Sequence, residues 1–172
     1  MSQHSERLPP ESITLINKVS EKSAFEKAKK YLAEKNCVLI TGVQGTGKTY
    51  LAESLVSDME KRKGQLKKMW ISSFSQLLEE TSKPTRNVNL YILDDIFYEL
   101  QLKSEFHETL TVVNDFMTNI AEKYIIITMP SYIWRQHIAL FSKTGLEDVH
   151  IDLNERDDSE KRYIITQLMS QH

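Results

Sequence analysis

The sequence predicts a three-layer α/β/α fold built on a mostly parallel sheet of five strands. Short, nearly unbroken apolar runs alternate along the chain with longer segments of helical periodicity. Strands that are apolar throughout are buried on both faces, because helices cover both sides of a parallel sheet. The length of 172 residues suits one domain and lets the chain bury a substantial core.

The first elements expected are a lead-in, a helix and a strand. Residues 1–19 are expected to be irregular, because a Pro-Pro pair at positions 9 and 10 blocks regular structure. Ser20 can cap a helix that runs to about Lys35, since apolar residues recur on one face of that segment. The run CVLITG then predicts a buried strand over residues 37–42.

The other elements continue this alternation. A second helix is expected from Lys48 to about Lys63, with Gly64 placed to end it. Apolar residues at three- and four-residue steps predict a long helix over 104–122. Apolar runs predict strands, and the segments between them predict helices: strands at 67–72, 89–95, 123–129 and 148–153, and helices at 73–80, 131–143 and from about residue 157.

Composition and charge exclude several classes of protein. No run of about 18 apolar residues occurs, so a membrane-spanning helix is excluded, and the polar N-terminus lacks the apolar core of a secretory signal. A single cysteine, Cys37, excludes an intrachain disulfide and fits a reducing compartment, so a cytoplasmic location is expected. Cys37 opens an apolar run and is interpreted as a small buried hydrophobe rather than a nucleophile.

The net charge of −2 gives no electrostatic footprint for nucleic acid. The charge is uneven, with +5 on the first 70 residues and −7 on the rest. Solvated helix faces account for the basic excess; the alternative is a bound anion, because the basic half contains a phosphate-binding motif.

That motif is GVQGTGKT at residues 42–49, which fits G-x-x-x-x-G-K-[ST] between a predicted strand and a predicted helix. Its glycines permit positive φ and bring backbone N–H groups against phosphate oxygens, and the following helix adds its positive dipole end. Lys48 is expected to reach the β- and γ-phosphates, and the Thr49 hydroxyl to ligate Mg²⁺. The predicted nucleotide-binding residues are Gly42, Val43, Gln44, Gly45, Thr46, Gly47, Lys48, Thr49 and Tyr50.

A second motif supplies two adjacent acids. The apolar run LYIL ends in Asp94 and Asp95, as expected of a Walker B strand. We expect Asp94 to belong to the Mg²⁺ shell, and Asp95 to polarise the attacking water as a general base. The alternative for Asp95 is a cap on the following helix or a surface ion pair.

Thr128 lies at the carboxyl end of the strand predicted over 123–129. In P-loop ATPases with an extra acid after Walker B, a strand lies between the P-loop and Walker B strands, and its polar end residue can sense the γ-phosphate. Thr128 is predicted to act as this third catalytic residue, beside Lys48 and Asp95; the alternative is a simple turn into Pro130.

No motif fixes the role of the arginines or tryptophans. Candidates for a transition-state arginine are Arg135, Arg156 and Arg162, with solvated surface positions as the alternative. Trp70 and Trp134 are expected to pack in the core or at its edge rather than stack on bases. No N-K-x-D motif follows the P-loop, so GTP is disfavoured and ATP is the expected nucleotide.

Four stretches resemble STAND-type P-loop NTPases, with the closest resemblance to the novel STAND NTPase group of the third type. The stretches are AFEKAKKYLAEKNCVLITGVQGTGKTYLAESLV, NLYILDDIFYEL, YIIITMPSYIW and VHIDLNERDDSEKRYIITQL. The resemblance implies the ASCE-type strand order 5-1-4-3-2. It also implies an ATP-driven switch placed between a sensor and an effector domain. Lys48, Thr49, Asp94, Asp95 and Thr128 match the family's functional positions.

Two departures from the family pattern bear on activity and domain organisation. Family members tend to have Ser-Arg after the strand-4 threonine, where this chain has Met129-Pro130, so hydrolysis is expected to be slow or replaced by binding alone. The chain stops at His172, where a helical lid or winged-helix domain would begin. Residues 20–172 are therefore expected to be a P-loop core without that lid.

The expected function is a Mg²⁺-dependent ATPase that acts as a signal-transduction switch. Expected partners are ATP and ADP, fused or separate sensor and effector modules, and a second copy in a nucleotide-dependent homo-oligomer, with no membrane or nucleic acid. A small-molecule or nucleotide kinase is one alternative, although no Arg-rich lid is found. A AAA+ type loader is another, although the acidic C-terminal half argues against it. A non-hydrolysing scaffold is the last.

Overall fold

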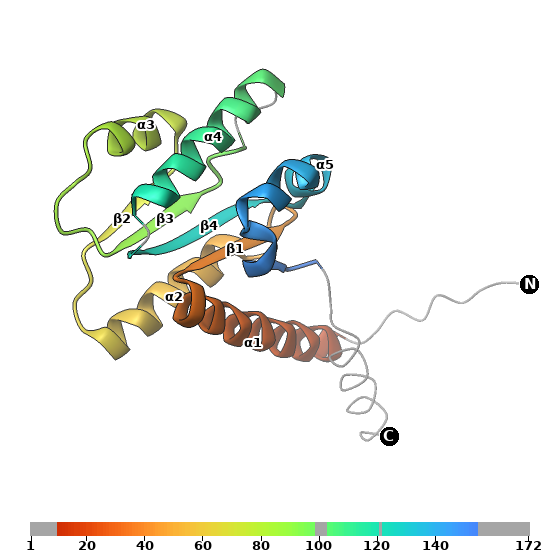
Figure 1. The fold of residues 1–172 in the computed structure, drawn as a ribbon. Helices are drawn as coiled ribbons and strands as arrows, with labels where there is room; N and C mark the ends of the chain where they lie inside the picture. Colours follow the sequence, from red (N-terminus) through yellow and green to blue (C-terminus); the bar gives the residue numbers. More distant parts are fainter. Residues whose placement is uncertain (1–9, 99–102, 121, 155–172) are drawn as a thin grey trace, which may run out of the picture.

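A computed structural model describes residues 10–98, 103–120 and 122–154. Its five strands form one parallel sheet in the order β2-β3-β4-β1-β5, with helices on both faces (Figure 1). The three-layer fold and the order 5-1-4-3-2 are confirmed. The strands are β1 (Cys37–Gly42), β2 (Lys68–Ile71), β3 (Leu90–Asp94), β4 (Tyr124–Pro130) and β5 (His150–Asp152). The α-helices are α1 (Pro10–Lys35), α2 (Lys48–Lys63), α3 (Phe74–Ser82), α4 (Lys103–Asn119) and α5 (Ser131–Phe141).

The first helix is longer than predicted. It begins at Pro10 rather than Ser20, so the expected irregular lead-in is wrong over residues 10–19. A proline in the first helical turn lacks only an N–H group that would have no partner inside the helix, and its φ already suits the helix. The proline pair is therefore compatible with a helix start. Residues 1–9 and the helix predicted from about residue 157 lie outside the described residues.

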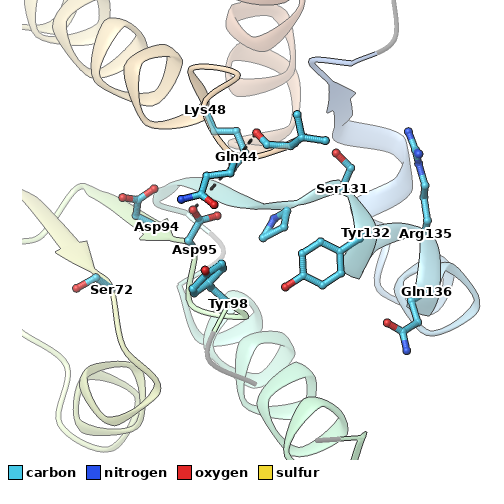
Figure 2. Close-up of a pocket in the computed structure, with 12 residues that line it drawn as sticks. Gln44, Lys48, Ser72, Asp94, Asp95, Tyr98, Ser131, Tyr132, Arg135 and Gln136 are labelled. Atoms are coloured by element: carbon cyan, nitrogen blue, oxygen red, sulfur yellow. Dashed lines mark hydrogen bonds and ion pairs between the residues drawn. The ribbon is translucent and has the colours of Figure 1, made fainter. Parts of the chain in front are cut away.

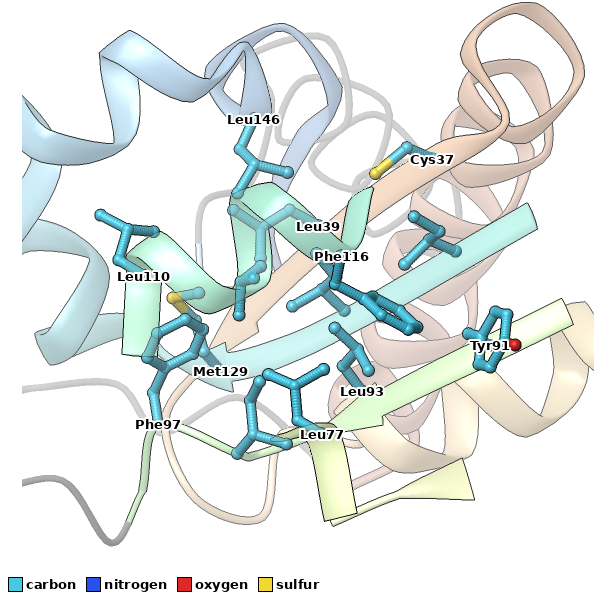
Figure 3. Packing of buried hydrophobic residues seen from close by; sticks show 14 of the residues in the cluster. Cys37, Leu39, Leu77, Tyr91, Leu93, Phe97, Leu110, Phe116, Met129 and Leu146 are labelled. Atoms are coloured by element: carbon cyan, nitrogen blue, oxygen red, sulfur yellow. The ribbon is translucent and has the colours of Figure 1, made fainter. Parts of the chain in front are cut away.

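Each face of the sheet has its own core, because successive strand residues point to opposite faces. Val38 and Ile40 of β1 pack with α1 and α2, whereas Cys37 and Leu39 pack with α3, α4 and α5 (Figures 1 and 3). Since both sets are buried, the strands read as unbroken apolar runs. Burial raises the pKa of the Cys37 thiol to about 12, as fits a packing residue.

Trp134 packs in the core as expected, whereas Trp70 is exposed at the edge of the sheet. Trp134 is buried on α5, with its ring 5.0 Å from that of Phe141 and 4.2 Å from that of His150. Trp70 lies on β2 at the edge of the sheet and is partly exposed. Within the described residues, no helix is long and apolar enough to cross a membrane.

The strand register determines where chemistry can occur. Gly42 at the end of β1 pairs with Pro130, and Asp94 at the end of β3 pairs with Thr128. The carboxyl ends of three neighbouring strands therefore meet at one edge of the sheet, where ligands bind in open α/β folds.

Candidate functional site

The loop from Gly42 to Gly47 is wound in a conformation that needs glycine. Gly47 has φ 88° at the start of α2, a left-handed backbone conformation that residues other than glycine rarely adopt. At Gly42 a Cβ atom would lie 2.2 Å from the Thr46 hydroxyl oxygen, which itself donates to the Val43 carbonyl at 2.7 Å. These glycines let the loop close on itself at the N-terminus of α2, which is a favourable place for phosphate.

Lys48 is a buried cation at the first residue of α2. Only 7% of it is exposed, although lysine is almost never buried without partners. Its Nζ donates to the Val43 carbonyl at 3.5 Å and lies 4.0 Å from Asp95 Oδ2 (Figure 2). Both contacts are long, so the ammonium group is free to shift toward a phosphate.

Asp94 joins the two hydroxyl-bearing residues of the site. Its Oδ1 accepts hydrogen bonds from Thr49 Oγ1 at 3.2 Å and from Thr128 Oγ1 at 2.7 Å. A carboxylate and a hydroxyl oxygen so placed are the donor set that Mg²⁺ takes beside phosphates. The residues present therefore fit the ion that the sequence implies.

Asp95 is held in an unusual backbone conformation. Its φ is 49°, and its N–H donates to both Thr128 Oγ1 (3.0 Å) and the Thr128 carbonyl (3.2 Å). Its Oδ1 is buried and has no hydrogen-bond partner among the described residues. Desolvation is the main cause that raises the pKa of this carboxyl group; Asp94 adds to the rise, and Lys48 and Thr128 oppose it. A buried carboxylate oxygen without a donor is suited to accept a proton or a hydrogen bond from a ligand.

The sequence left open that Asp95 makes a surface ion pair and that Thr128 only forms a turn into Pro130, and the contacts bear on both alternatives. Asp95 makes the ion pair to Lys48, inside the site rather than on the open surface. Thr128 is fully buried and uses its hydroxyl group to join Asp94 to the Asp95 backbone. The catalytic and metal roles of these residues remain predictions.

A cleft of about 910 Å³ lies over this edge of the sheet. Figure 2 shows the loop and the two acids on one part of its wall, and Tyr98 and the α5 side chains on another. Sequence reasoning missed several residues that line the cleft. Two of them, Ser72 and Ser131, directly follow β2 and β4, so their place at the ends of strands could have indicated them. The missed residues are Ser72, Tyr98, Ser131, Tyr132 and Gln136.

Two other expectations concern residues near the loop. Tyr50 is 66% exposed on the first turn of α2, and its contact with the nucleotide stays a prediction. Arg135 does line the cleft, with Nη2 3.4 Å from Asp152 Oδ2. Arg156 and Arg162 lie outside the described residues.

Comparison with known families gives a match over nearly the whole chain. The model of the family "Novel STAND NTPase 3" matches residues 20–171. The chain belongs to this family. The match confirms the resemblance drawn from the four sequence stretches and supports a nucleotide-binding P-loop domain. No protein with a curated description matches the chain.

Solved structures similar to this STAND NTPase domain include replication proteins. Domain III of the DnaA replication initiation protein from Thermotoga maritima aligns with TM-score 0.55 and 18% identity, over 96% of this chain and 76% of that one. The DnaC helicase loader aligns with TM-score 0.51 and 18% identity, over 78% and 89%. AMPPCP-bound DnaA from Aquifex aeolicus aligns with TM-score 0.50 and 20% identity, over 89% and 52%. At these identities the likeness shows the fold alone.

Proposed function

We propose that this STAND NTPase domain binds ATP with Mg²⁺, hydrolyses it slowly, and acts as a regulatory switch. One observation carries the proposal. Five polar residues from the ends of three neighbouring elements are joined by contacts of 4.0 Å or less: Lys48, Thr49, Asp94, Asp95 and Thr128. A charge-bearing network of this kind at a phosphate-binding loop is what phosphoryl transfer to water requires.

Each residue has a task that its surroundings favour. The loop N–H groups and Lys48 bind the phosphates, and Thr49 and Asp94 hold the metal, which supplies positive charge to neutralise the phosphate oxygens. Asp95 Oδ1, buried and without a donor, accepts the proton of the attacking water. Thr128 fixes both acids relative to one another and joins this group to β4, which leads directly into α5.

The switch role follows from that connection. Since α5 begins one residue after β4 ends, a change at Thr128 is passed on to α5 without an intervening loop. Sensor and effector modules and a nucleotide-dependent homo-oligomer are the partners we propose, in the cytoplasm, for a core over residues 20–172. Met129-Pro130 stands where family members tend to have Ser-Arg, so the arginine is missing at this place and we propose slow turnover.

The experiment that tests the function measures ATP binding by calorimetry and phosphate release by the purified chain. We expect binding with Mg²⁺, slow release of phosphate, and preference for ATP over GTP. We expect EDTA to abolish release, and added Mg²⁺ to restore it, because Thr49 and Asp94 alone leave the phosphate charge unneutralised. Tight binding without any release would leave a non-hydrolysing module, and absence of binding would overturn the proposal.

Thr128→Val tests the link between the two acids. Valine keeps the shape but removes the donor to Asp94 and one acceptor of the Asp95 N–H group, so we expect a loss of about 1–3 kcal/mol in unfolding free energy. Turnover should fall with it, because neither acid is then held in place. Thermal unfolding and phosphate release measure the two effects. Thr128→Ser keeps the hydroxyl group and should lose much less of either; equal losses in both variants would refute the link.

Phosphoryl transfer to an acceptor is a second candidate, because the cleft extends beyond the acids. Its far side carries two partly exposed aromatic side chains, Tyr98 and Tyr132, with Arg135 beside them. These groups suit a planar or anionic acceptor. Incubation with ATP and a panel of nucleosides and nucleoside monophosphates would separate the two functions, since a kinase forms a phosphorylated acceptor and an ATPase forms only free phosphate.

A further inference from the structure

Val43, the first residue after β1 and the second of the Walker A motif, is bound from a distant part of the chain. The Val43 N–H group donates to Asn154 Oδ1 at 3.3 Å, across 111 residues of sequence. Among the residues that the structure describes, the donors to the Val43 carbonyl are close in sequence, at Thr46 and Lys48. Within the described part of the chain, the Asn154 contact is the hydrogen bond that connects residues 43–47 to a segment beyond α2.

The Asn154 amide is held in one orientation by its other contacts. Its Nδ2 donates to Ser131 Oγ and to Asp152 Oδ1 at 3.0 Å, and its own N–H donates to the same carboxylate oxygen at 2.9 Å. A flipped amide would place its oxygen against the Asp152 carboxylate and its NH₂ group against the Val43 N–H group. Both contacts would be repulsive, so the network selects the orientation with Oδ1 toward the loop.

The residues that hold Asn154 are themselves fixed. Ser131 is the buried first residue of α5, and 3% of the Asp152 side chain is exposed. Arg135 lies 3.4 Å from the other oxygen of that carboxylate and partly balances its charge. Leu153 donates to the Thr41 carbonyl at 2.8 Å, and its Cβ would lie 3.4 Å from a Cβ placed on Gly42. The end of β5 therefore runs directly alongside the start of the loop.

We propose that Asn154 is a positioning residue of the nucleotide site, whose amide bridges the Walker A loop to the start of α5. The bridge holds the loop ready for the phosphates. Glycines give this loop many accessible conformations, and ordering each residue on binding would cost affinity. An anchor at Val43 removes part of that cost in advance. The inference rests on the proposed nucleotide binding, and it adds a residue that no Walker motif contains.

The test compares the full chain with Asn154→Ala and Ser131→Ala, using calorimetric titration with ADP and with ATP and Mg²⁺. Asn154→Ala should weaken both affinities about tenfold, the size of one lost hydrogen bond that pre-orders the loop. Ser131→Ala keeps the bond to Val43 and loses only one of the contacts that orient the amide, so its loss should be smaller. The nucleotide-free melting temperature of Asn154→Ala should stay within about 2 °C of wild type, since the residue is exposed at the end of an edge strand.

Hydrogen exchange at the Val43 amide of the nucleotide-free protein gives a readout that does not depend on binding. Exchange should be faster in Asn154→Ala than in wild type, with the central strand β4 unchanged. Wild-type affinity and exchange in Asn154→Ala would overturn the inference and leave the proposed function intact. Absence of binding in the wild type would instead overturn the proposed function, while the exchange comparison still decides whether Asn154 holds the loop.

Discussion

Asp95→Asn is expected to keep ATP binding and lose turnover by about 10²–10⁴-fold, the contribution of a positioned general base. Asparagine has nearly the same shape but cannot take the proton from the attacking water. It also tolerates the positive φ of 49° at this position, which alanine does not. The two hydrogen bonds from the backbone N–H to Thr128 do not involve the side chain and should persist.

The stability of this variant provides its control. The pKa of Asp95 is raised by desolvation, so the folded protein disfavours the charged carboxylate. Replacing the carboxylate with a neutral amide should therefore give a melting temperature equal to that of the wild type or higher. A variant that loses turnover and melts lower would have lost the fold rather than the base. Asp148→Asn, on an exposed carboxylate away from the cleft, is the matched substitution and should change neither quantity.

The same pKa direction predicts how turnover depends on pH. A base must be ionised to act, and the pKa of Asp95 lies above the ordinary aspartate value. The rate should therefore fall as the pH drops through that raised pKa, earlier than an ordinary aspartate would allow. The acid-side fall should be absent from the residual rate of Asp95→Asn, as a pH profile of phosphate release from both proteins would reveal.

Local signals were sufficient for most of the fold. The bounds of β1 and α2 follow from the run CVLITG, from the loop glycines and from Gly64, which has φ 81° just after α2. Glycines with positive φ flank α2 on both sides, and this backbone conformation ends a helix. The start of α1 was wrong because a proline pair is compatible with both a helix start and a break, and only tertiary packing decides between them.

The site was predictable only as far as the strand ends. Asp94 and Thr128 were placed correctly because parallel strands bring their carboxyl ends to one edge. Asn154 follows β5 in the same way, but nothing near it in sequence indicates that its amide binds Val43. That contact depends on how the ends of β5 and β1 run past one another, which apolar periodicity does not report.

Lys48→Ala is expected to reduce the affinity for ATP by about 10- to 100-fold, the loss of a charge-assisted contact to phosphate. The affinity for ADP should fall less than the affinity for ATP, because ADP has no γ-phosphate for Lys48 to contact. Lys61→Ala, at the exposed end of the same helix, removes the same charge far from the loop and should bind both nucleotides as wild type does. Equal affinities in the two lysine variants would contradict the assignment of Lys48.

The variant also tests whether Lys48 and Asp95 act on one another. The lysine lies 4.0 Å from Asp95 Oδ2 and lowers the pKa of that carboxyl group, against the desolvation that raises it. Without the ammonium group, the pKa of Asp95 should rise further, so the fall of turnover at low pH should move to higher pH. A pH profile of Lys48→Ala at saturating ATP measures this shift. An unshifted profile would mean that the two residues act on the nucleotide independently, with Lys48 binding the phosphates and Asp95 accepting its proton from water without the help of that charge.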